Sequence, residues 1–215
     1  MGSTRAKLFV RFAHMKRTII AAMLLTGLLV VQAQERLSRE EALKYAFFAS
    51  ADLKEMLKTP IPTDPDVKRP VALRDADHGG MILPEAKLSA DTFANAGKEV
   101  KPVGQLWLVK LAPMHEGEVV SKAKLRIVHV RAGDQEADAV CCALGVCKNA
   151  DRGLELLVYG KDKEPLTRVP MKSISGPQDN PIEMSCERLD SKALVTLKFL
   201  GKYEVTFSVT EPEEY

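Results

Sequence analysis

The sequence lacks the short motifs by which catalytic sites are most often recognised. It contains no Gly-x-Ser-x-Gly elbow, no His-Glu-x-x-His pair and no glycine-rich phosphate loop. These absences favour a protein that is not an enzyme and that binds no nucleotide. They decide less than a motif would, because a catalytic triad can be assembled from residues in any chain order.

Basic charge is also scarce once the first residues are set aside. Residues 1–33 hold five of the 31 Lys and Arg residues and none of the 29 Asp and Glu residues, which leaves residues 34–215 with a net charge of −3. Charges of both signs are interspersed along that part of the chain. A nucleic-acid-binding protein needs a clustered basic face, so we expect no nucleic-acid partner.

No apolar run reaches the roughly 20 residues that a membrane-spanning helix needs. The run from Thr18 to Val31 follows Lys16 and Arg17, and the next residues lead to Ala33. A basic N-terminal region, a short apolar region and small residues at the cleavage position predict a secretory signal peptide over residues 1–33, cleaved after Ala33. Met15 is an alternative start of translation. The competing interpretation is an anchor that is never cut. We expect export to the periplasm or the cell exterior, with no membrane span after cleavage.

Residues 34–58 are predicted to form one N-terminal amphipathic helix. Ser38 and Glu41 match a capping box, and apolar residues follow at mostly helical spacing. The helix either packs on the domain behind it, which is the interpretation we favour, or docks a protein partner. A proline-rich stretch over residues 59–70 is predicted to be an extended linker, because each proline disfavours helix at the residue before it.

Residues 71–215 are predicted to form an antiparallel β-sandwich or a partly closed barrel, so the fold class is mainly β. Short apolar runs alternate with turn residues, which is typical of such folds. One short helix is expected near residues 90–96. The expected strands cover residues 103–112, 124–131, 136–144, 153–159, 182–188, 194–199 and 203–209.

The last two strands permit a prediction of register. Val195, Leu197 and Phe199 alternate with polar residues, and so do the apolar residues from Tyr203 onward. All of these side chains share one sheet face only if Phe199 pairs with Tyr203 across a three-residue loop, because a one-residue slip would mix the faces. We therefore expect Gly201 in that loop to have a positive φ.

Four cysteines are few, but three of them lie within seven residues of each other. An exported chain meets an oxidising environment, where an even number of cysteines favours disulfides. We expect Cys186 to bond either Cys141 or Cys142. Cys147 would bond the other and close a hairpin-like loop. The alternative is a metal or redox site at Cys141, Cys142 and Cys147 that binds copper or zinc through thiolates.

Histidines and carboxylates offer one weaker metal candidate. Asp75, Asp77 and His78 lie close together before two glycines, but Asp and Gly are also the usual residues of turns, and we favour a turn. His129 is expected to be partly buried on a strand, and Trp107 to lie in the core.

Two functional hypotheses follow. The first is an exported, non-catalytic β-sandwich protein with a binding or structural role at the cell envelope, without a cofactor. The alternative is an envelope metal-handling or thiol-redox protein that uses the cluster of Cys141, Cys142 and Cys147.

Overall fold

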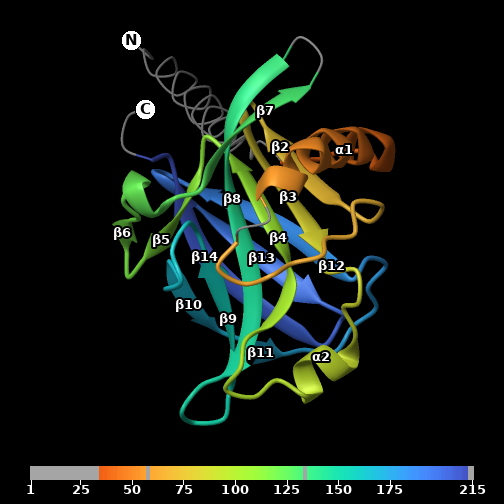
Figure 1. Cartoon of the computed structure of the whole chain (residues 1–215), viewed down its shortest axis with the longest axis vertical. Helices are drawn as coiled ribbons and strands as arrows, with labels where there is room; N and C mark the ends of the chain where they lie inside the picture. Colours follow the sequence, from red (N-terminus) through yellow and green to blue (C-terminus); the bar gives the residue numbers. More distant parts are fainter. Residues whose placement is uncertain (1–33, 57–58, 133–134, 213–215) are drawn as a thin grey trace, which may run out of the picture. The chain divides into compact units, whose positions relative to one another are not determined.

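The structure is a computed structural model that describes residues 34–56, 59–132 and 135–212. The predicted signal peptide over residues 1–33 lies outside these residues. The described chain is mainly β and contains two antiparallel sheets that do not close into a barrel (Figure 1). No described helix is long and apolar enough to cross a membrane.

The first sheet has the strand order β1-β2-β3-β4-β8-β9-β10, and β7 pairs with one end of β8. Its strands alternate side chains between an inner face and an outer face. The strands are β1 (Glu35–Arg36), β2 (Val71–Asp75), β3 (His78–Pro84), β4 (Lys101–Val109), β7 (Ile127–Ala132), β8 (Gln135–Lys148), β9 (Leu154–Tyr159) and β10 (Thr167–Pro170).

The second sheet has the order β12-β13-β14-β5-β6, and β11 pairs with β14. Its strands are β5 (Ala112–His115), β6 (Glu118–Val119), β11 (Lys172–Ser173), β12 (Ile182–Leu189), β13 (Lys192–Phe199) and β14 (Tyr203–Thr210). The helical segments are α1 (Arg39–Met56), α2 (Ala90–Ala94) and the 3-10 turn η1 (Lys122–Lys124).

The main core lies between the two sheets. Fully buried side chains from both sheets meet there, including Leu106, Leu144, Leu197 and Phe199. Ion pairs link the β1–β2 edge of the first sheet to the β12 edge of the second. Arg36 lies 2.7 Å from Glu183, and Arg188 lies 3.2 Å from Asp75.

The predicted register of the last hairpin is confirmed. Phe199 pairs with Tyr203, and Gly201 in the loop has a φ of +66°. Val195, Leu197 and Phe199 are buried, as expected if one face of the hairpin covers the core.

The outer face of the first sheet is also covered. Helix α1 contacts β2, β3 and β7, and Figure 1 shows it lying across these strands. Ser38 accepts a hydrogen bond from the backbone N–H of Glu41, and its own hydroxyl and backbone N–H bind the Glu41 carboxylate. The small residues Ala42, Ala46 and Ala49 face the sheet, which permits a close approach of the helix.

The proline-rich stretch over residues 59–70 lies against the same outer face. Pro65 forms an isolated bridge with Glu85, and Ile61 packs near Leu157. The buried Thr63 hydroxyl accepts a 2.8 Å hydrogen bond from the side-chain amide of Gln105, a fully buried residue of β4. These contacts hold the extended stretch to the sheet.

Candidate functional site

A cavity of about 690 Å³ lies between α1 and the outer face of the first sheet. Tyr45 and Ala49 of α1 form one wall, and the β2–β3 hairpin and the ends of β4, β7 and β8 form the rest. The cavity results from the arrangement of the chain, because a sheet face that is covered by one helix rather than by a second sheet is covered only in part. Concave, mostly apolar sites of about 300–1,000 Å³ are the usual form of small-molecule sites.

The floor of the cavity is apolar. Met81, Trp107 and Val109 contribute side chains that alternate outward along β3 and β4, and Ala139 of β8 continues the surface. The Trp107 indole N–H donates a 3.3 Å hydrogen bond to Gln105 Oε1, so its polar group is already engaged within the protein. Trp107 therefore offers the cavity a ring surface rather than a hydrogen-bond donor.

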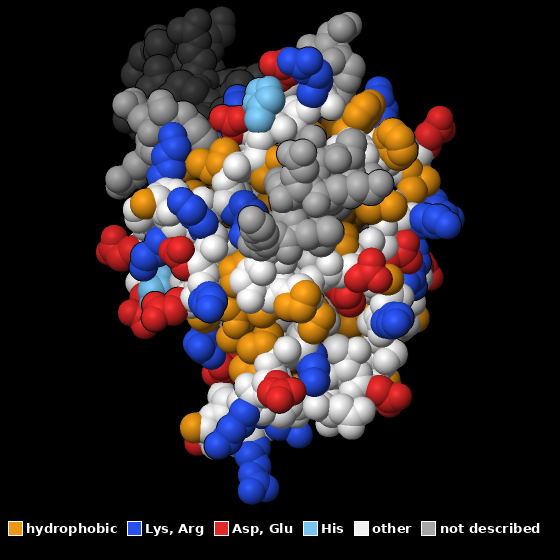
Figure 2. All heavy atoms as spheres, in the orientation of Figure 1, with side chains coloured by type: hydrophobic (Ala, Val, Ile, Leu, Met, Phe, Trp, Pro, Cys, Tyr) orange, Lys and Arg blue, Asp and Glu red, His pale blue; other side chains and the backbone are white. Residues whose placement is uncertain are grey.

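The rim of the cavity carries charges of both signs. Arg74 lies 3.0 Å from Glu35, and this hydrogen bond raises the pKa of the Arg74 guanidinium. Lys110 pairs with Asp77, and its hydrogen bond is the main cause that lowers the pKa of the Asp77 carboxyl. Figure 2 likewise shows acidic and basic side chains intermingled over the face that it presents.

The candidate metal residues Asp75, Asp77 and His78 lie at the tip of the β2–β3 hairpin. A turn is present, but the two glycines predicted to form it lie on β3, paired with β2. Asp75 and His78 are cross-strand partners, and Ala76 between them has a φ of +50°. Each acid already binds a cation, and His78 Nε2 lies 2.8 Å from Glu211 Oε1. Within the described residues, no group of three or more His, Cys, Asp or Glu side chains is arranged to hold a metal ion.

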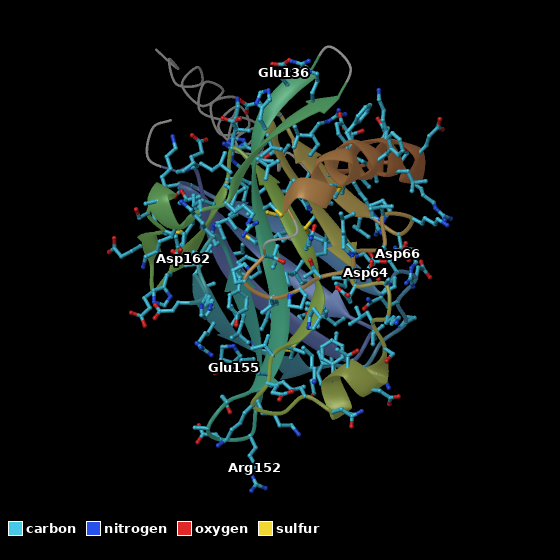
Figure 3. All side chains as sticks on the ribbon, viewed as in Figure 1. Asp64, Asp66, Glu136, Arg152, Glu155 and Asp162 are labelled. Carbon is cyan, nitrogen blue, oxygen red and sulfur yellow. The ribbon has the colours of Figure 1, made fainter. Side chains whose placement is uncertain are left out.

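The prediction that His129 is partly buried is wrong. Its side chain is exposed on β7, with Asp138 at 3.0 Å and Glu136 at 3.3 Å on the neighbouring strand. The hydrogen bond with Asp138 is the main cause that raises the pKa of His129. The exposure follows from the pairing of this hairpin, which extends past β4, and Figure 3 shows Glu136 near its tip.

The prediction of two disulfides is also contradicted, since all four cysteines are free. Cys141, Cys142 and Cys147 lie on the single strand β8, where no hairpin-like loop forms. An extended strand advances about 3.3 Å per residue, so Cys147 lies about 20 Å from Cys141 along it. Disulfides require Cα atoms within about 7 Å of each other.

The other possible disulfides, between Cys141 and Cys142 and from Cys186 to β8, are excluded by the direction and the spacing of the strands. Cys141 and Cys142 point to opposite faces of β8, since Cys141 contributes to the cluster under α1 and Cys142 to the core between the sheets. Cys186 lies on β12 beside Gln34 and Asp75, near β2. Three strand spacings of about 4.8 Å separate β2 from β8, a distance of about 14 Å that no disulfide spans.

Because Cys141, Cys142 and Cys147 are spread along β8 and over both of its faces, they do not form the thiolate cluster that a metal or redox site would need. Burial raises the pKa of Cys141 to about 12 and also raises that of Cys142. Burial is likewise the main cause that raises the pKa of Cys147 and of Cys186. The thiolate is the form that attacks disulfides and binds soft metals, so all four residues are expected to behave as small, inert core side chains.

We expect all four thiols to be alkylated when the protein is unfolded without a reductant. Mass spectrometry after iodoacetamide treatment in denaturant should show four added groups. The folded protein should leave Cys141 and Cys142 unmodified, because both are buried. A denatured, unreduced protein that takes up only two groups, or none, would contradict the geometry of β8.

A second cavity lies at the opposite end of β8. It has a volume of about 560 Å³, and Cys147, Lys98 and Arg168 are among its lining residues. Glu155 also lines it, 3.6 Å from Arg168, and Figure 3 shows Glu155 toward that end of the molecule. Polar side chains predominate here, and the thiol of Cys147 is buried.

Most residues of the cavity under α1 were not identified from the sequence. The predicted core position of Trp107 is confirmed, since its side chain is buried, but the sequence does not show that its ring also lines a cavity. Gly79, which the sequence places in a turn, lies on β3 and lines the cavity. The available signal was the apolar character of β4 at successive positions, which indicates cover on both faces. No family model, curated protein or solved structure matches the chain.

Proposed function

We propose that this chain is an exported, non-catalytic binding protein whose ligand occupies the cavity between α1 and the first sheet. The observation that carries the proposal is the cavity itself, which combines an apolar floor with a charged rim at a volume suited to a small molecule. Export rests on the predicted signal peptide over residues 1–33. The alternative role in metal handling or thiol chemistry is not favoured, because the thiols are dispersed and their pKa values are raised.

Gly79→Leu is expected to fill the cavity and weaken ligand binding at least tenfold. Gly79 lines the cavity, and a Cβ built there would meet Val109 Cβ at 3.7 Å, an ordinary van der Waals contact. A leucine side chain would then occupy ligand space without a backbone clash. N-phenylnaphthylamine is a suitable probe, because its emission rises in apolar sites and dye bound in the cavity is expected to quench Trp107, the single tryptophan.

Gly176→Leu is the matched control. Gly176 is an exposed glycine outside the cavity, and a Cβ built there meets no atom within 4 Å. The control should bind the probe as the unmodified protein does. Equal binding by all three proteins, or no binding by the unmodified protein, would overturn the proposal.

A further inference from the structure

We infer that the ligand of the cavity under α1 is an uncharged, mainly apolar small molecule, such as a neutral lipid-like chain, rather than an ion. The inference rests on the proposed function and concerns the chemistry of the same site. It follows from what the described side chains leave available to a ligand.

The floor offers contact surface but no free charge. Met81 and Val109 supply only apolar atoms, and the Trp107 N–H is bound to Gln105. Backbone groups of Gly79 and its neighbours on β3 lie in the paired region of the sheet, between β2 and β4. A charged group on this floor would lose its water without gaining a partner, which is strongly unfavourable.

The cations of the rim are already paired. Arg74 lies 3.0 Å from Glu35, and Lys110 binds Asp77. An anionic ligand would have to displace a carboxylate that belongs to the protein. Exchanging one exposed ion pair for another brings little net free energy, since such pairs contribute about 0–1 kcal/mol.

The other ionisable groups of the rim are paired as well. His78 lies 2.8 Å from Glu211, and Glu136 binds Arg131. A cationic ligand therefore meets a carboxylate that already has a partner. Because both signs are present and engaged, the rim favours neither an anion nor a cation.

One uncharged polar group does face the cavity. Tyr45 is half-buried on α1 and lines the cavity, where its hydroxyl interacts electrostatically with Arg74. It can donate to, or accept from, a single hydroxyl or ester group of a neutral ligand. The site thus accommodates a neutral molecule that has one polar end.

The test compares three probes that each have a straight chain of ten carbons and that differ in the charge at its end. Decanol, decanoate and decyltrimethylammonium are each titrated to displace N-phenylnaphthylamine, with Trp107 emission as a second signal. Decanol is expected to bind at least tenfold more tightly than either ion. Tyr45→Phe should weaken decanol about threefold, since one neutral hydrogen bond is lost.

The outcomes separate this inference from the function it depends on. Binding of decanoate or decyltrimethylammonium as tight as that of decanol would overturn the neutral ligand while leaving the cavity as the binding site. If no probe binds, or if Gly79→Leu binds every probe as the unmodified protein does, the proposed function itself is wrong.

Discussion

Replacing Phe199 with alanine is expected to lower the free energy of unfolding by about 4 kcal/mol, within the range for buried phenylalanine truncations. Phe199 is fully buried at the end of β13, and its ring lies 5.8 Å from that of Phe93 on α2. Phe93 in turn stacks on Tyr203 at 4.8 Å. The substitution would therefore leave a cavity where α2, β13 and β14 meet, and partial relaxation would not fill it.

Thr206→Ala is the matched control for this prediction. Thr206 lies on the exposed face of the same hairpin, where its hydroxyl is 2.9 Å from that of Thr196. Loss of an exposed cross-strand pair should cost less than about 1 kcal/mol. Urea unfolding followed by Trp107 emission measures both variants. A loss below about 1.5 kcal/mol for Phe199→Ala would show that this aromatic group is not tightly packed.

The final hairpin could be predicted from the sequence because its two strands are buried on one side only. Strict alternation at Val195, Leu197 and Phe199 leaves one register that keeps the buried face uniform, and the three-residue loop follows from it. Local pattern and tertiary environment agree there, so the residues themselves contain enough information.

Strand β8 could not be predicted in the same way, since its surroundings are non-local. Gly145 resembles a turn residue, but β8 continues through it because β4 and β9 pair on either side. A Cβ at Gly145 would lie 2.3 Å from Val100 Cγ1, so the glycine permits a close approach from the outer face. The residues that come close to Gly145 are Val100 and Ile61, which are far away in the sequence. The residues around Gly145 therefore do not predict this contact.

The cavity illustrates a further limit. The apolar run in β4 indicates that both sheet faces are covered, but not whether the cover is a sheet, a helix or a ligand. Trp107 and Leu106 are adjacent, yet Trp107 faces α1 and Leu106 faces the second sheet. Only the placement of α1 over part of the outer face distinguishes a packed core from a site with free volume.

Gly104→Ala is expected to lower the free energy of unfolding by about 3 kcal/mol. A Cβ at Gly104 would lie 2.4 Å from the carbonyl oxygen of Leu83 and 3.2 Å from Pro84 Cα, and both contacts are with backbone. The φ of Gly104 is +157°, a value that side chains rarely permit. Overpacking and backbone strain each cost about 1–3 kcal/mol, and neighbouring backbone in a paired sheet cannot move aside locally.

Gly97→Ala provides the comparison, because a Cβ there meets no atom within 4 Å. Its effect on unfolding should stay within about 1 kcal/mol. Equal effects of the two substitutions would contradict the close approach at Gly104.

A β-bulge beside this glycine determines which way the cavity floor faces. Pro102 pairs with Gly145 and Gly104 with the next residue, Leu144, so β4 has one extra residue, Val103, at the bulge. A strand that loses its bulge turns every following side chain to the other face. Gly104→Ala should therefore weaken probe binding as well as stability, because Trp107 depends on that register to face α1. A destabilised Gly104→Ala protein that still binds N-phenylnaphthylamine with full affinity would show that the bulge is not needed to orient the floor.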